Sequence, residues 1–323
     1  MIGWYYSRSV MVVLGCLFMV RGSFSALPAT DGTVPAHLQD AVALLDLSKF
    51  PALPGASRSS ATVAVNSCTV PKGDVGKAIA FYREKLAALG WKEETDAKLK
   101  FESAQGAQLF FYKEGFILYV SMGVSPNDGE LNAVVIYLGN IDARVLPRLT
   151  GAKVLSAGPD RLIYETELKP EAVRAFFAEA LKKQGWLEYK RPIPKGIPAD
   201  AFGNEQKFTR HGLKIELMTM EQEQKLRIFV NINLMSAEWP ILPDADAMEY
   251  ENSPLFLLYH TSKTPEQVSD FYSTELSKLG WKAQAVKPGK KPGFTTQTFE
   301  REGQRPLKLE CLKDNAGCVV QLK

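Results

Sequence analysis

The sequence FYREKLAALGW, from Phe81 to Trp91, has the pattern of a helix that ends at a glycine and is followed by a tryptophan. The same pattern returns as FFAEALKKQGW at residues 176–186 and as FYSTELSKLGW at residues 271–281, so successive tryptophans are 95 residues apart both times. Such regular spacing indicates an internal repeat. A period of this length is long enough for each copy to bury its own core.

A second pattern follows each of these helices. It reads F-x-[K/R]-x-G and occupies residues 111–115, 208–212 and 299–303. Its glycine fits a tight turn between two strands, because glycine readily adopts the positive φ that such turns need. The repeated unit is therefore a whole module and not the helix alone.

Runs of apolar and β-branched residues predict strands on both sides of each helix. In the third copy, residues 255–262 predict a strand that leads into a helix capped by Thr264, with Pro265 at its first position. We expect an α+β fold of three tandem β-α-β-β-β modules, each with one helix packed on an antiparallel sheet. The expected parts are a signal peptide (1–25), a leader segment (26–47) and modules at 48–140, 141–235 and 236–323.

The N-terminus has the features of an export signal. Arg8 precedes the apolar run Val10–Val20, and small residues then place cleavage near Ser25. Residues 13–16 also loosely resemble a lipobox, so a lipid anchor on Cys16 is the alternative. Both interpretations predict an extracytoplasmic protein that is secreted, periplasmic or attached to the cell envelope. No later segment is apolar for long enough to predict a transmembrane span.

The charge balance bears on the kind of partner. The formal net charge is +3, and removal of residues 1–25 takes away two arginines and no acid, which leaves +1. A nearly neutral chain lacks the field that nucleic-acid binding usually needs. We therefore expect an envelope protein, a glycan or a small ligand as the partner, and no nucleic acid.

Residues 46–56 (DLSKFPALPGA), the helix pattern and residues 141–152 (IDARVLPRLTGA) together resemble a group of uncharacterised exported bacterial proteins built from tandem modules. The resemblance covers nearly the whole mature chain. It implies this architecture and an extracytoplasmic setting, but no activity, cofactor or site residue. The third copy departs from the proline pattern at residues 236–247.

The repeated tryptophan has two interpretations, a ligand contact or part of a helix terminator. With Gly90 as the left-handed residue after the helix, Trp91 and Leu86 occupy the two positions whose side chains touch in a Schellman motif. The pattern thus favours three structural latches with buried rings. Their residues are Leu86, Gly90, Trp91, Leu181, Gly185, Trp186, Leu276, Gly280 and Trp281.

Three cysteines remain after export. Cys311 and Cys318 lie in a predicted hairpin around Asp314 and Asn315, which would place them opposite one another as disulfide candidates. The alternative is two free, half-buried thiols, because adjacent strands bridge only with particular geometry. Cys68 would then be unpaired.

The search for catalytic residues gives few candidates. The FY pair at the helix start is similar to vicinal-oxygen-chelate enzymes, whose paired modules hold a metal between histidine and glutamate, and His260 with Glu310 would form half such a site. The glycine spacing and the odd number of modules depart from that family. The sequence predicts no metal site and no cofactor, and a single-site enzyme using His260, His211 or Cys68 is the alternative to a binding protein.

One polar feature recurs, the basic residue beside the hairpin glycine. It predicts either hairpin solubility and edge protection or a row of cations that meets anionic glycans or lipid headgroups. The residues of that second hypothesis are Lys113, Arg210, Arg301, Lys287, Lys290 and Lys291. The sequence as a whole favours an exported, non-catalytic protein that acts in binding, adhesion or envelope scaffolding.

Overall fold

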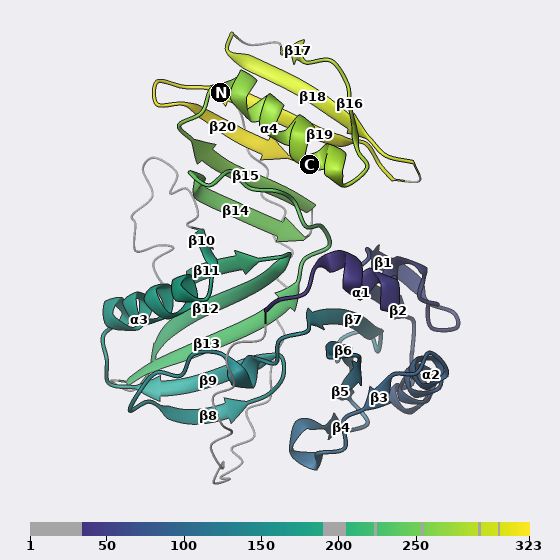
Figure 1. Cartoon of the computed structure of the whole chain (residues 1–323). Helices are drawn as coiled ribbons and strands as arrows, with labels where there is room; N and C mark the ends of the chain where they lie inside the picture. Colours follow the sequence, from purple (N-terminus) through teal and green to yellow (C-terminus); the bar gives the residue numbers. More distant parts are fainter. Residues whose placement is uncertain (1–33, 190–204, 223–224, 253–254, 290–291, 303) are drawn as a thin grey trace.

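The computed structural model describes residues 34–189, 205–222, 225–252, 255–289, 292–302 and 304–323. These residues form an α+β fold with three antiparallel sheets, each covered by one long helix (Figure 1). The expected signal peptide, Cys16, Lys290 and Lys291 lie outside the described residues. Within them, no helix is long and apolar enough to cross a membrane.

Sheet A belongs to the first module and is covered by helix α2 (Val75–Ala88). Its strands are β1 (Ser57–Ala61), β2 (Val65–Val70), β3 (Lys92–Glu93), β4 (Phe101–Glu102), β5 (Gly106–Lys113), β6 (Phe116–Val124) and β7 (Leu131–Gly139). Their order is β1-β2-β7-β6-β5-β3, and β4 pairs with β5. The short 3₁₀ turns nearby are η1 (Leu47–Lys49), η2 (Ala97–Leu99) and η3 (Ala143–Val145).

Sheet B belongs to the second module and is covered by helix α3 (Pro170–Lys183). Its strands are β8 (Lys153–Ala157), β9 (Arg161–Thr166), β10 (Leu187–Tyr189), β11 (Glu205–Arg210), β12 (Leu213–Gln222) and β13 (Lys225–Leu234). Their order is β10-β11-β12-β13-β9-β8. Read from the opposite edge, sheet A has the equivalent order β3-β5-β6-β7-β2-β1.

Sheet C belongs to the third module and is covered by helix α4 (Pro265–Lys278). Its strands are β14 (Asp246–Asn252), β15 (Leu255–Thr261), β16 (Lys282–Ala283), β17 (Lys287–Pro288), β18 (Phe294–Glu300), β19 (Leu307–Lys313) and β20 (Cys318–Leu322). Their order is β14-β15-β20-β19-β18-β16, and β17 pairs with β18. All three sheets thus share one topology, in which the strand before the helix pairs with the last strand of the module.

The expected β-α-β-β-β pattern omits two strands that each sheet contains. One is the first edge strand, β1, β8 or β14, and the other is the short strand after the tryptophan, β3, β10 or β16. In β1, four of the five residues are exposed, so the sequence shows no buried face there. The strand after the tryptophan has two or three residues, too few for a periodic signal.

Each helix buries one stripe of side chains against its sheet. In α3 the stripe is Val173, Phe177 and Leu181, spaced by four residues. The positions 95 residues before and after are also buried, and these are Ala78, Tyr82, Leu86, Val268, Tyr272 and Leu276. The repeat in sequence therefore corresponds to a repeat in packing.

All three helices end in the same way. Gly90 has a φ of +80°, its backbone amide donates to Ala87 (2.9 Å), and the Trp91 amide donates to Leu86 (3.0 Å). This is the pair of hydrogen bonds that defines a Schellman motif. The amides of Trp186 and Trp281 likewise donate to Leu181 and Leu276, both over 3.1 Å. Trp91 and Trp186 are only 2% and 3% exposed, whereas Trp281 is half-buried.

The modules are not packed equally. Most buried residues of the first and second modules form one continuous core, beside a small cluster of Phe110, Ile117, Tyr119 and Leu138, whereas the third module has a separate core. Sheets A and B contact each other at Gly139, where a Cβ would collide with the Leu213 side chain. Lys207 on β11 joins sheet B to sheet C through an ion pair with Glu251 on β14 (2.8 Å). Sheet C is thus connected to sheet B by this ion pair and by the linker that follows β13.

The leader segment folds back onto this junction. Its helix α1 (Leu38–Leu44) lies between sheet A and the linker that leads to β14 (Figure 1). The Tyr137 hydroxyl donates to the carbonyl oxygen of Ala41 (2.9 Å), and the Asn140 carboxamide oxygen accepts from the Ala36 amide (2.8 Å). The described part of the leader, residues 34–47, is therefore packed into the fold.

Candidate functional site

Two of the three histidines of the chain meet a glutamate where the leader, the second module and the linker to the third module join. His37 Nδ1 lies 2.7 Å from Glu238 Oε1, and His211 Nδ1 lies 3.5 Å from the same oxygen. The two imidazole rings contact each other edge to face, with centroids 4.3 Å apart. Among the described residues, this is the one group of three or more His, Cys, Asp or Glu side chains whose ligand atoms lie within 4.8 Å of one another. We call these three residues the junction triad.

Local structure fixes each member of the triad. His211 follows Arg210 in a two-residue hairpin turn, where His211 and Gly212 both have positive φ, +49° and +76°. Both values are those of a type I′ turn, and they project the His211 side chain from the end of the sheet. The turn also receives the linker, because the Met235 amide donates to the Gly212 carbonyl oxygen (2.7 Å).

The other two members hold each other and the start of the leader helix. His37 is the residue before α1, and its backbone amide donates to Asp40 Oδ2 (3.1 Å). Glu238 Oε2 accepts from the backbone amide of Leu38 (2.9 Å), which leaves Oε1 to face the two imidazoles. The carboxylate of Glu238 is thus oriented by one hydrogen bond while its other oxygen is shared.

The site is open to solvent on one side. The side chain of His37 is 59% exposed, that of His211 is 34% exposed and that of Glu238 is 25% exposed. Imidazole nitrogens and a carboxylate oxygen are the donor set that zinc and other first-row transition metals bind. The arrangement can therefore hold three chain segments together, either through hydrogen bonds or through a shared cation.

No pattern in the sequence indicates this triad. His37 and His211 are 174 residues apart, and Glu238 stands in a linker with no local motif around it. The signal that was available is the scarcity of histidine, with three in the chain. Only the fold shows that two of them converge.

The recurrent basic residues have a structural partner. Lys113 Nζ donates to the carbonyl oxygen of Leu89 (2.9 Å), and Arg210 Nη1 donates to that of Gln184. Leu89 and Gln184 are the C-cap residues of α2 and α3, whose last carbonyl groups have no partner inside the helix. Arg301 is exposed and lies beside Gly280, at the equivalent end of α4. The repeated cation therefore serves the helix C-terminus, where positive charge is favourable.

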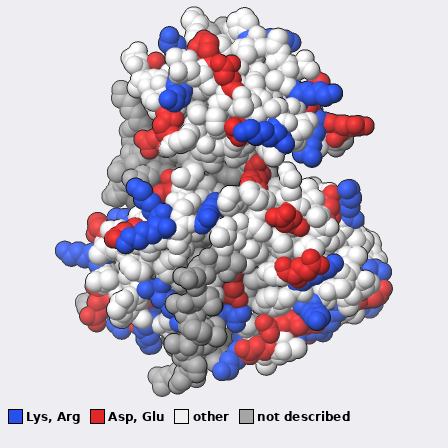
Figure 2. Space-filling view, viewed as in Figure 1, with Lys and Arg blue, Asp and Glu red and all other residues white. Residues whose placement is uncertain are grey.

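Lys287, the described member of the expected basic loop, is exposed on β17. Figure 2 shows that Lys and Arg alternate with Asp and Glu over the visible face of the molecule, without a large area of one sign. The surface in that view is thus mixed in charge.

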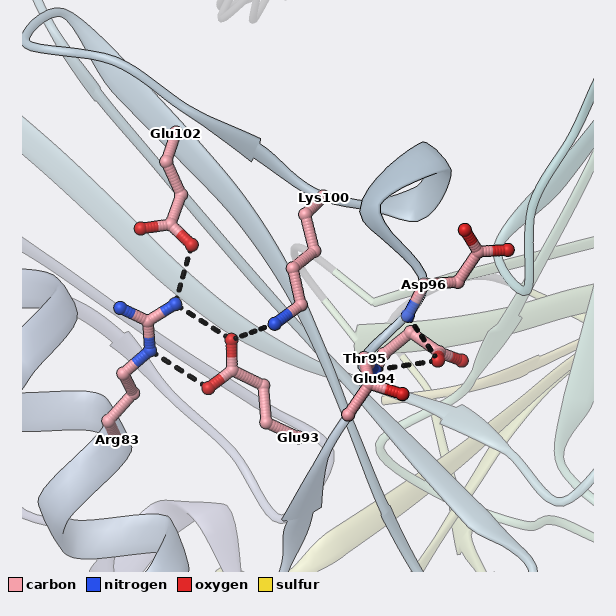
Figure 3. Close-up of polar contacts among 7 residues, drawn as sticks. All are labelled: Arg83, Glu93, Glu94, Thr95, Asp96, Lys100 and Glu102. Atoms are coloured by element: carbon pink, nitrogen blue, oxygen red, sulfur yellow. Dashed lines mark hydrogen bonds and ion pairs between the residues drawn. The ribbon is translucent and has the colours of Figure 1, made fainter.

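A network of charged side chains in the first module is shown in Figure 3. Arg83 on α2 donates through Nε and Nη2 to the two carboxylate oxygens of Glu93 (2.8 Å each), and Lys100 reaches the same carboxylate (3.0 Å). The Arg83 guanidinium holds the pKa of Glu93 below its ordinary value, and burial opposes this in part. Glu102 Oε1 accepts from the same Nη2 atom of Arg83 (2.5 Å). This network ties α2 to strands β3 and β4.

The residues of the enzyme alternative lie apart from one another. Cys68 is buried on β2 beneath α2, with its sulfur 3.9 Å from the Tyr82 hydroxyl. His260 Nε2 lies 3.2 Å from Asp314 Oδ2. Glu310, the residue that the similarity to vicinal-oxygen-chelate enzymes would pair with His260, instead binds Lys308 (2.6 Å) and Lys323 (2.7 Å).

The two cysteines of the last hairpin are not directly opposite. The register of β19 and β20 pairs Cys311 with Val320 and Cys318 with Lys313, so the cysteines are diagonal neighbours. Both are free, buried thiols on the face under α4. Their contact and their burial raise the pKa of Cys311. The expectation of directly facing cysteines is therefore wrong, since the turn is shifted relative to the one around Asp314 and Asn315 that the sequence suggested.

No protein-family model, curated protein or solved structure matches the chain.

Proposed function

We propose that the chain is an exported, non-catalytic protein whose three modules form a binding or scaffolding component of the cell envelope. The observation that carries this proposal is the position of the junction triad. It joins the leader, the second module and the linker to the third module through Glu238 (2.7 and 3.5 Å to the two imidazoles). Side chains placed in this way maintain the arrangement of modules, which a scaffold requires.

Further contacts between modules support the same function. Lys207 binds Glu251 across sheets B and C (2.8 Å), and the Thr62 hydroxyl of the first module lies 2.6 Å from that of Ser236 in the linker. The linker therefore contacts all the parts that precede it. A chain with a fixed spacing of three similar surfaces can bind a repetitive or extended partner at several points.

The repeated polar positions support a structural role for the repeat. Lys113 and Arg210 donate to helix-end carbonyl groups, and the repeated tryptophans close the same helix ends. What is common to the copies thus maintains the fold. Partner recognition is expected in the parts where the copies differ, because loops on a rigid scaffold commonly carry binding residues.

The proposal is tested by binding to fractions of the producing cell's envelope. The tag-free mature chain should co-sediment saturably with one fraction, either membrane or glycan. Charge reversal at Lys287, Lys290 and Lys291 tests the third module's basic loop, and reversal at three exposed lysines of the first module, Lys77, Lys92 and Lys98, is the matched control. Saturable binding that both variants retain would remove the basic loop from the proposal. The absence of saturable binding to every fraction would contradict the proposal itself.

Export is tested separately by the mass of the protein recovered from cells. A mature chain that begins after Ser25 supports cleavage as expected, and an acylated chain that begins at Cys16 supports the lipid anchor. A chain that keeps residues 1–25 in the cytoplasm would contradict both.

The single-site enzyme is the second candidate, and the junction triad is the observation that favours it. Three protein ligands with an open side is the pattern of catalytic zinc sites. Turnover of a small-molecule substrate that is lost in His211→Asn and retained in His260→Gln would establish the enzyme in place of the scaffold.

A further inference from the structure

We propose that the junction triad binds one divalent transition-metal ion, with Zn²⁺ as the best match. The bound ion would hold the leader against the second module and the linker. The ligands are His37, His211 and Glu238, whose ligand atoms already lie within 4.8 Å of one another. Metal binding here does not depend on what the modules bind.

The distances suit a tetrahedral ion after a small movement. Ligands bound at 2.0–2.1 Å to a tetrahedral zinc are about 3.3 Å from each other. The contact of His211 Nδ1 with Glu238 Oε1 is 3.5 Å, and that of His37 Nδ1 with the same oxygen is 2.7 Å. His37 would retreat by about 0.6 Å to admit the ion. It is the most exposed member of the triad, so this movement meets little packing resistance.

Without an ion, the two imidazole Nδ1 atoms share a single hydrogen-bond acceptor, Glu238 Oε1. Both imidazole Nδ1 atoms face one oxygen, so each ring would have to place its proton on Nδ1 and share that acceptor. A cation at the same point would satisfy all three ligands at once. Glu238 Oε2 would keep its hydrogen bond from the Leu38 amide. That bond would orient the carboxylate so that Oε1 faces the ion.

The donor set selects the class of metal. Two nitrogens and one oxygen suit Zn²⁺, Cu²⁺ or Ni²⁺, whereas Ca²⁺ and Mg²⁺ prefer sites made of oxygen alone. The solvent side of His37 leaves room for water as the fourth ligand. Because the ligands come from residues 37, 211 and 238, the ion would couple segments that are far apart in sequence.

The test is a titration of the tag-free mature chain with Zn²⁺ by calorimetry, and with Co²⁺ by visible absorption. One equivalent of Zn²⁺ should bind, and Co²⁺ should give the intense visible bands of a tetrahedral site. His37→Gln, His211→Asn and Glu238→Gln should each weaken binding by a factor of about ten or more. Asn is chosen at position 211 because it tolerates the positive φ of the turn. His260→Gln, which removes the histidine outside the triad, should bind as the unmodified chain does.

Two results would overturn the proposal. One is the absence of saturable binding at one equivalent, and the other is equal weakening by His260→Gln and His37→Gln. His37→Gln alters an exposed side chain, so its circular dichroism should be unchanged and loss of folding cannot explain its effect. As a second readout, Zn²⁺ should raise the unfolding temperature of the unmodified chain and of His260→Gln, but not that of His37→Gln.

Discussion

The ammonium group of Lys113 donates to the carbonyl oxygen of Leu89, 24 residues earlier, over 2.9 Å. Lys113 is the last residue of β5 and Leu89 is the C-cap residue of α2. One hydrogen bond therefore connects the two recurrent patterns of the sequence, the helix that ends in Gly-Trp and the hairpin that contains F-x-[K/R]-x-G. The second module repeats this connection with Arg210 and Gln184.

Removal of this cation should destabilise the end of helix α2. Lys113→Met keeps the aliphatic stem and should lower the free energy of unfolding by about 0.5 kcal/mol, as for other exposed cations at helix C-termini. Urea unfolding measures the change, with Lys98→Met, an exposed lysine of the same module, as the control. Equal stability of the two variants would show that the bond contributes nothing.

The buried tryptophans should matter for stability in proportion to their burial. Trp186→Ala should lower the free energy of unfolding by about 3–5 kcal/mol, because it opens a cavity beside Leu181. Trp281→Ala should lower the free energy of unfolding by less, since Trp281 is half-buried. Chemical unfolding measures both variants. If Trp186→Ala spared stability and abolished binding to envelope material, the tryptophan would be a ligand contact and not a latch.

The Arg83–Glu93 pair should give the first module a defined response to acid. Because Arg83 lowers the pKa of Glu93, the stabilising contribution is present above the ordinary glutamate pKa, about 4.3, and is lost as the pH falls through the lowered value. Partial exposure limits the contribution to about 1 kcal/mol or less. Unfolding free energies between pH 6 and about pH 3 should therefore fall less steeply in Glu93→Gln than in the unmodified chain. Parallel curves for the two proteins would exclude this pair as the source.

The diagonal register of the last hairpin predicts free thiols. The Cα atoms of diagonal neighbours on antiparallel strands are about 7–8 Å apart, which is more than the usual Cα separation of two cysteines joined by a disulfide. The mature chain, alkylated in denaturant without reductant, should therefore gain three adducts by mass, one each at Cys68, Cys311 and Cys318. A single adduct would show that Cys311 and Cys318 are bonded. In the native protein alkylation should be slow, because all three thiols are buried.

The sequence predicts those features whose physical cause is local. The helix, the left-handed glycine and the tryptophan follow each other within a few residues, so the 95-residue repeat is sufficient to predict the helix ends. The edge strand β1 could not be predicted, because it buries little and gains its pairing from β2. The partner of Lys113 was also out of reach, since a single sequence does not show which helix end a hairpin residue will face. The junction triad needs three segments to be placed together, which only the packing of modules provides.

The most direct test of the junction is hydrogen–deuterium exchange in the leader. Glu238→Ala removes the contacts to His37 and to the Leu38 amide, so amides of residues 34–40 should exchange at least about tenfold faster, which corresponds to about 1.4 kcal/mol of lost protection. The exchange rates of the β6 amides should be unchanged in this variant. Substitution of the exposed Glu84 by alanine should change the exchange rates neither at residues 34–40 nor in β6. Unchanged exchange at residues 34–40 in Glu238→Ala would contradict the claim that this junction holds the leader to the second and third modules.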